Sequence, residues 1–423
     1  MGILTLVRLS AQLDLGILSL LVEPIKRDMD LSDSDIGLLL GFAFAVFYLG
    51  LGVPLSKLID SHSRRAILAI GVAVWSLSTA LCGLANNFTQ LFLARAAVGA
   101  GESVNGPATY SMIADMFPRE RLARAIALLN MGSLIGSGLS LIFGAFVIHW
   151  LSTMEMPHLP FIGQPRHWQA VFLIVGLPGL ILTGLMFCFP EPERRGGQKR
   201  AESFAGILRF MRINWRLFLP MFLALLLSGT ESGGSLMWRP AFLQRTYGWT
   251  PAQIGTVIGV VTMVTSIAGV FAGSYLSERF APRHDNANLR VVLIGWIIAT
   301  PCMVISPLMP DVLAAITLIG VASFAAGMGA PTQNAALQSV VPNQMRGQIT
   351  ALYLLTYTLA AQGIGPSFIA AITEKIVGHE AGLRYALSGS AIVMMPIAIG
   401  VMMIALKPYA AVIARLKAEE AQG

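Results

Sequence analysis

Twelve apolar stretches, each near the length that crosses a bilayer, constrain this chain more than any other feature. Of its 423 residues, 55% are hydrophobic and only 12% are charged. A soluble domain carries roughly 25% charged residues, and a membrane-spanning helix needs about 20 mostly apolar residues. We therefore expect an all-α membrane protein whose twelve transmembrane helices lie near residues 3–22, 36–59, 66–85, 88–115, 121–150, 168–189, 216–243, 251–277, 290–307, 311–336, 347–375 and 383–406.

The distribution of basic residues predicts the orientation of these spans. Nineteen of the 29 Lys and Arg residues fall in one alternate set of loops or in the C-terminal tail, whereas six fall in the other set. The positive-inside rule therefore predicts a plasma or inner membrane protein with both termini in the cytoplasm. The same distribution explains the net charge of +7 without a nucleic-acid partner.

A break and a weak repeat divide the spans into two groups of six. Residues 190–215 contain two prolines, a Gly-Gly pair and many basic residues, which is typical of a solvated cytoplasmic linker. The segment from Pro107 to Pro118 matches that from Pro331 to Pro342 at a shift of 224 residues. We expect two pseudo-symmetric six-helix bundles, as in rocker-type transporters, with the boundaries 1–189, 190–215 for the linker, 216–406, and 407–423 for the tail.

Three charges interrupt the apolar stretches. Asp14 lies in the first, and Arg95 and Glu102 share one face of the fourth, about 10.5 Å apart along the helix axis. A charge at the bilayer centre costs a few kcal/mol and by default marks an ion or substrate path. We expect these residues to couple transport to protons; a static ion-pair network that only fixes helix packing is the alternative.

The loop Ser56-Lys57-Leu58-Ile59-Asp60-Ser61-His62-Ser63-Arg64-Arg65 joins the second and third spans. It resembles the G-x-L-a-D-r-x-x-R-R signature of the major facilitator superfamily, with Ser56 and Ser61 as departures. We expect Asp60, Arg64 and Arg65 to form a cytoplasmic gate. The alternative is that the two arginines only keep this loop on the cytoplasmic side of the membrane. Glu278 and Arg279 occupy the corresponding place in the second half and are the expected pseudo-symmetric gate pair.

A narrower resemblance covers most of the N-terminal half. Asp14, the run EPIKRDMDLSDSDIGLLLGFAFAVFYLGLGVPLSKLIDSHSRR and the run VGAGESVNGPATYSMIADMFPRERLARA together resemble the Spinster branch, which includes sphingolipid and lysolipid transporters. The resemblance implies proton-linked movement of an amphipathic lipid, with Arg95 and Glu102 at the positions of the family's fourth-helix pair. Leu15 stands where the family usually has Arg after the first-helix Asp.

Polar residues in the second half are weaker candidates for the substrate cavity. Glu231 lies in a glycine-rich run of the seventh span, which we expect either to open the helix to a substrate headgroup or to form a flexible gate with Glu231 near the outer surface. Gln333 and Asn334 in the tenth span either line the cavity or pack between helices.

The motifs of other function classes are absent from the sequence. There is no phosphate-binding G-x-x-x-x-G-K-[ST] loop, no nucleophile elbow and no His pair with metal-ligand spacing within a span. We therefore expect no enzyme, cofactor or metal site, but a monomeric secondary transporter working by alternating access, with protons, membrane lipids and a small-molecule or lipid substrate as partners. The alternatives are a transporter of a small drug, sugar or organic acid, and a non-transporting scaffold or receptor.

Overall fold

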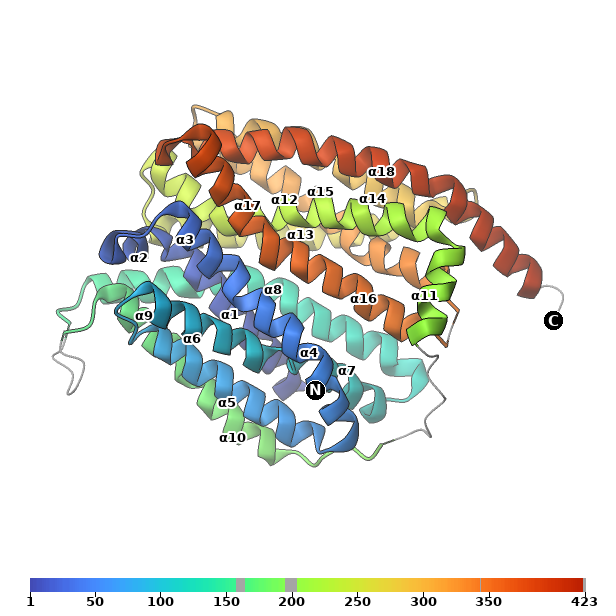
Figure 1. Ribbon diagram of the computed structural model, residues 1–423, viewed down its shortest axis with the longest axis horizontal. Coiled ribbons are helices and arrows are strands. Elements are labelled where there is room, and N and C mark those ends of the chain that lie inside the picture. Colours follow the sequence, from blue (N-terminus) through green and yellow to red (C-terminus); the bar gives the residue numbers. More distant parts are fainter. Residues whose placement is uncertain (157–163, 195–203, 343, 421–423) are drawn as a thin grey trace. The chain divides into compact units, whose positions relative to one another are not determined.

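The computed structural model describes residues 1–156, 164–194, 204–342 and 344–420, and every regular element in these ranges is helical. In chain order the elements, with η marking π- or 3-10 segments, are α1 (Gly2–Leu20), α2 (Val22–Met29), α3 (Asp33–Gly37), η1 (Leu38–Phe42), α4 (Ala43–Ser61), α5 (Arg64–Cys82), α6 (Phe88–Glu102), α7 (Asn105–Met116), α8 (Arg119–Ser152), α9 (His167–Gly176), α10 (Pro178–Leu185), η2 (Met186–Cys188), α11 (Phe204–Ile213), α12 (Trp215–Tyr247), α13 (Pro251–Phe280), α14 (Ala287–Ile305), η3 (Ser306–Leu308), α15 (Val312–Ser339), α16 (Arg346–Thr358), η4 (Leu359–Ile364), α17 (Gly365–Ala371), η5 (Ile372–Val377), η6 (Glu380–Gly382) and α18 (Leu383–Glu420) (Figure 1).

The all-helical membrane fold is confirmed. In the part of the chain that the structure describes, eleven helices are long and apolar enough to cross a membrane. The fourth expected span, 88–115, is not among them because it breaks into α6 and α7 at Ser103 and Val104. Pro107 explains the break: it has no backbone N–H, and its ring clashes with the carbonyl four residues earlier, which is that of Ser103.

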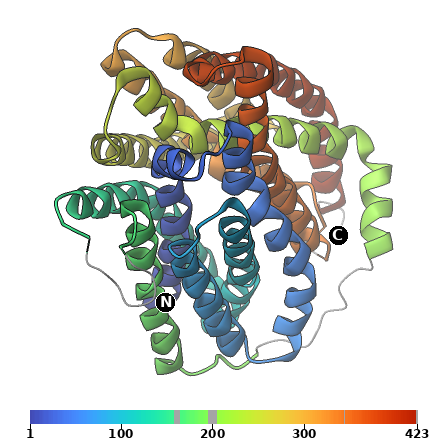
Figure 2. The same cartoon turned by 60° about the vertical axis from the view of Figure 1, so that its left-hand side comes forward.

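The chain forms two compact units. Unit 1 comprises Met1–Arg195, Gly234–Met263 and Gln362–Leu383, and unit 2 comprises Gly196–Gly233, Val264–Ala361 and Arg384–Gly423. Within unit 1, α1 packs along α8, and α5 packs against α6 and α9; Figure 2 shows these blue to green helices as a bundle. Within unit 2, α14 and α15 form the main helix pair (Figure 1).

Each unit has its own apolar core. In unit 1 the core includes Phe44, Trp75 and Met112, and in unit 2 it includes Phe218, Trp296 and Met402. Many large apolar side chains also remain exposed along the helices, among them those of Ile181, Phe146 and Phe271. Such side chains suit lipid contact, because a helix surface in hydrocarbon needs no polar face.

Two regions that were expected to lie outside the spans contain helix. Within the expected linker, 204–213 forms α11, and Ile207 of this helix belongs to the core of unit 2. In the expected tail, α18 continues as far as Glu420. The division into two six-helix bundles remains a prediction, because the compact units take segments from both halves of the sequence.

Candidate functional site

The three intramembrane charges lie within unit 1, and all three are buried. Asp14 on α1 is 4% exposed, Arg95 on α6 is fully buried, and Glu102 at the end of α6 is 5% exposed. Gly16 lets α1 pack closely on α8, since a methyl group there would lie 2.1 Å from the Ser140 Oγ. The low exposure of Asp14 shows that its side chain lies in the protein interior, as expected of a functional charge inside a membrane.

Two glycines bring α6 against its neighbours and so position Arg95 and Glu102. A methyl group at Gly99 would lie 2.3 Å from the carbonyl oxygen of Phe44 on α4. A methyl group at Gly101 would lie 2.7 Å from the backbone nitrogen of Trp75 on α5. Small residues permit such close helix contacts in membranes.

We expect Gly99→Ala to lower the free energy of unfolding by about 1–3 kcal/mol, because the added methyl group overpacks the contact between α4 and α6. Gly106→Ala is the matched control, since no atom lies within 4 Å of a methyl group at that position. Thermal unfolding in detergent measures the stability of both variants. A Gly99→Ala variant as stable as Gly106→Ala would contradict this account of the packing.

Among the residues that the structure describes, the guanidinium of Arg95 contacts no counter-ion directly. None of its three nitrogens has a hydrogen-bond partner among the described residues, and no ion pair within 4.0 Å joins it to a described carboxylate. Its nearest aromatic contact is Phe44, 5.9 Å from the guanidinium carbon to the ring centroid. The field of Arg95 nevertheless acts on both Asp14 and Glu102. The cluster is thus close enough for electrostatic coupling but is not a closed salt bridge.

Sequence reasoning did not select Arg8, although it adds a fourth charge to this region. Its Nε donates a hydrogen bond of 2.7 Å to the Ser133 Oγ on α8, and its field acts on Glu102 and on the hydroxyl of Tyr48. The signal that singled out Asp14 would have found it, because Arg8 also interrupts the first apolar stretch.

Arg64 of the expected gate lies at the start of α5, where its buried side chain forms two ion pairs. Its side chain is 2% exposed and pairs with Asp115 at the end of α7. Its Nε also lies 3.1 Å from the Glu191 Oε1, and its Nη2 donates to the carbonyl of Pro192. Arg65 donates its backbone N–H to Glu191 and its Nη1 to the carbonyl of Phe189. The start of the linker is therefore tied to the beginning of α5.

Glu191 acts as an anion at a helix N-terminus, a favourable arrangement. Burial would raise the pKa of Glu191, but the N–H groups of Arg65 and Arg64 and the Ser63 hydroxyl hold it below its usual value of 4.5. A lowered pKa means that the ionised form stabilises the fold above pH 4.5 and that this contribution is lost as the pH falls through the lowered value.

We accordingly expect thermal stability to be nearly constant between pH 6 and pH 8, and the difference between wild type and Glu191→Gln to shrink as the medium is acidified below about pH 4.5. Thermal unfolding of both proteins across this range measures the difference. A difference that grows on acidification would contradict the assignment.

For the remaining expected gate residues, the described side chains make no contact that would close a gate. Asp60 belongs to α4, but its side chain lies outside the described part of the structure. Glu278 and Arg279, at the end of α13, are exposed; among described residues neither forms an ion pair, and Arg279 donates only a 3.5 Å hydrogen bond to Tyr275. Their gating role remains a prediction.

The three cavity candidates lie in unit 2. Glu231 is fully buried in α12, which runs unbroken through the glycine-rich segment. The continuous helix contradicts the expectation that this run opens the helix. The glycines serve packing instead: a methyl group at Gly233 would lie 2.0 Å from the carbonyl oxygen of Ala361. The role of Glu231 in the cavity or in a gate remains a prediction. Gln333 and Asn334 are half-buried on α15.

A second charge network, in unit 1, was not predicted. Arg245, near the end of α12, places two nitrogens 2.7 and 2.8 Å from the carboxylate of Asp33 and its Nε 2.7 Å from Glu23. Lys26 pairs with Asp33 and lies 2.7 Å from Glu380. All but Glu380 have side chains no more than 10% exposed. We call Glu23, Lys26, Asp33, Arg245 and Glu380 the Arg245 network.

Known proteins resemble this chain along most of its length. The Major Facilitator Superfamily model matches residues 4–366. An MFS-type efflux pump of Mycolicibacterium smegmatis is 26% identical over 384 residues, or 89% of this chain and 84% of the pump. Protein spinster homolog 1 of Xenopus tropicalis is 25% identical over 84% of this chain and 69% of that protein. The crystal structure of a bacterial homolog of the human lysosomal transporter Spinster, inward-facing and unoccupied, aligns with a TM-score of 0.77 at 24% identity, covering 97% of this chain and 96% of its own.

Proposed function

Because the chain belongs to the major facilitator superfamily and is a multi-pass membrane transporter rather than an enzyme, we propose that it moves an amphipathic lipid, such as a lysophospholipid or sphingoid lipid, together with protons by alternating access. The resemblance of the N-terminal half to the Spinster branch implies the class of substrate. The buried charges of α1 and α6 support the coupling.

The observation that carries the proposal is the fully buried guanidinium of Arg95, whose three nitrogens have no hydrogen-bond partner among the described residues. A buried charge without hydrogen-bond partners is costly, so the site favours an incoming anion. The phosphate of a lysophospholipid is such an anion, and arginine binds it with two parallel hydrogen bonds.

Coupling follows from the competition between this phosphate and the nearby carboxylates. The positive charge of Arg95 interacts electrostatically with the carboxylate of Asp14. A phosphate bound to Arg95 cancels that charge, and Asp14 then takes up a proton to avoid a second buried negative charge. Lipid and proton therefore bind together and cross together.

A second candidate is a small organic acid or drug. A carboxylate would pair with Arg95 as a phosphate does, and the similar M. smegmatis protein is an efflux pump. In either case we place both termini in the cytoplasm and assign the cytoplasmic gate to Asp60, Arg64, Arg65, Glu278 and Arg279, with Glu231, Gln333 and Asn334 contributing to the wall of the substrate cavity.

Flux measurements in proteoliposomes test the proposal. We expect wild-type protein to move a fluorescent lysophospholipid faster under an imposed pH gradient, and Arg95→Gln to move it no faster than empty liposomes do. Arg166→Gln, which removes an exposed arginine paired to Asp28 at 3.7 Å, is the control and should behave as wild type. Transport of a monocarboxylate but not of the lysophospholipid would favour the second candidate. Unchanged lysophospholipid flux in Arg95→Gln would exclude the role given to Arg95.

A further inference from the structure

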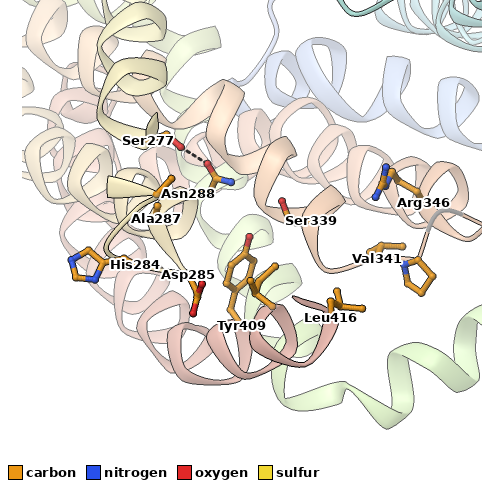
Figure 3. A pocket seen from close by; sticks show the side chains of 13 residues that line it. Ser277, His284, Asp285, Ala287, Asn288, Ser339, Val341, Arg346, Tyr409 and Leu416 are labelled. Atoms are coloured by element: carbon orange, nitrogen blue, oxygen red, sulfur yellow. Dashed lines mark hydrogen bonds between the residues drawn. The ribbon is translucent and has the colours of Figure 1, made fainter. Parts of the chain in front are cut away.

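A polar cavity of about 390 Å³ lies at one end of unit 2, and its lining includes none of the residues to which the proposed transport is assigned. Its lining comes from five helices: Ser277 of α13, Asn288 of α14, Ser339 of α15, Arg346 of α16 and Tyr409 of α18 (Figure 3). The volume falls in the range of small-molecule sites, roughly 300–1,000 Å³.

The cavity lies where apolar spans end. Asn288 is the second residue of the span Ala287–Leu308, Ser339 is the last of Val312–Ser339, and Arg346 is the first of Arg346–Val377. The ends of membrane spans lie at the level of the lipid headgroups. The positive-inside rule predicts that this end is cytoplasmic, and the cytoplasmic leaflet is rich in anionic lipids.

Hydrogen-bonding groups line the interior of the cavity. The Ser277 Oγ lies 2.5 Å from the Asn288 Oδ1, and Tyr409, which is 1% exposed, lines the cavity together with Ser339 and Asn288 (Figure 3). Arg346 supplies a cation at the rim, where Asp285 is also exposed. The exposed position of Asp285 leaves its charge screened by solvent.

The repeat in the sequence explains why this cavity exists. At the shift of 224 residues, Arg64 corresponds to Asn288 and Asp115 corresponds to Ser339. In unit 1 the ion pair between Arg64 and Asp115 occupies the space between the helix ends. In unit 2 two shorter, neutral side chains stand at these positions, and space remains beside them.

We propose that this cavity binds the phosphate of an anionic phospholipid from the adjacent leaflet. Arg346 supplies the countercharge, and the hydroxyl and amide groups of Tyr409, Ser339 and Asn288 supply hydrogen bonds. The apolar side chains of Ile413 and Leu416 on the same wall contact the glycerol and the first carbons of the acyl chains. The bound lipid is a resident one, independent of the transported solute.

Lipid binding to the purified full-length protein in neutral detergent tests this site. Native mass spectrometry with phosphatidylglycerol, phosphatidylcholine or inorganic phosphate as the probe should show that the wild type prefers phosphatidylglycerol. Arg346→Gln should weaken phosphatidylglycerol binding about fivefold, the effect of one interfacial arginine. Ser339→Tyr, which fills the cavity from an exposed position, should abolish the preference.

The matched control is Arg290→Gln, which removes an exposed arginine in the first turn of α14, a residue that is outside the cavity lining. It should bind phosphatidylglycerol as the wild type does. Equal weakening in Arg290→Gln and Arg346→Gln, or wild-type binding by Ser339→Tyr, would overturn the site. Inorganic phosphate binding as tightly as phosphatidylglycerol, with the same sensitivity to Arg346→Gln, would make the ligand a soluble phosphate and overturn the lipid assignment.

Discussion

Asp14→Asn will reduce pH-gradient-driven lipid uptake to the level of empty liposomes. The Asn side chain is nearly isosteric with Asp but cannot exchange a proton, so the cluster loses the group that we expect to be protonated when Arg95 is occupied. Because Asp14 is 4% exposed and lies in no ion pair among the described residues, the substitution should leave folding and membrane insertion intact. Initial uptake rates with and without a gradient measure the effect.

Asp30→Asn provides the matched control. Asp30 is exposed between α2 and α3 and has a positive φ of 53°, a conformation that Asn adopts as readily as Asp. Its uptake should equal that of the wild type. Retention of gradient-driven uptake by Asp14→Asn, in protein that elutes as a single peak in size-exclusion chromatography, would remove Asp14 from the coupling mechanism.

Arg245→Gln will shift the transporter away from the conformation described here. The substitution leaves the buried carboxylate of Asp33 without its bidentate contact to Arg245 and that of Glu23 without its single contact. Removing one partner of a buried ion pair costs about 3–5 kcal/mol. If an alternative conformation exposes both carboxylates to water, the cost falls on the described conformation alone, and the fraction of protein in the alternative conformation rises by at least about 100-fold.

Cysteine accessibility measures this shift. Ser367 on α17 is half-buried, and its hydroxyl donates to the carbonyl of Gly37. In a background without Cys82, Cys188 and Cys302, a cysteine introduced as Ser367→Cys should react faster with a membrane-impermeant maleimide when Arg245 is replaced by Gln. Arg166→Gln, whose ion pair is exposed, should leave the rate unchanged. Equal maleimide reaction rates with and without Arg245 would show that the Arg245 network does not stabilise the described conformation.

The helical layout could be predicted from the sequence because membrane spans depend on local composition. Apolar stretches and positively charged loops are recognised from about 20 consecutive residues. Every expected span except the fourth overlaps a described helical stretch that is long and apolar enough to cross a membrane. The break in the fourth span, at Ser103, results from a clash between the ring of Pro107 and one backbone carbonyl. The overall composition of the span does not predict such a local clash.

The partners of individual charges could not be predicted, because they depend on contacts between distant segments. Arg245 lies more than 200 residues from Glu23 and Asp33, and in the sequence it looks like an ordinary loop arginine. The sequence groups Arg64 with Asp60 in the expected gate, whereas its described ion-pair partners are Asp115 and Glu191. The presence of a buried charge is visible in a sequence, but the identity of its partner requires the fold.

The central claim, that lipid and proton cross together through the cluster of Asp14, Arg95 and Glu102, is tested most directly by measuring proton movement during lipid flux. Proteoliposomes with a pH-sensitive dye inside are given an inward lysophospholipid gradient and no initial pH gradient. The account predicts internal acidification that depends on the lysophospholipid and is absent in Asp14→Asn. Lysophospholipid entry without acidification, or the same acidification in Asp14→Asn, would contradict it.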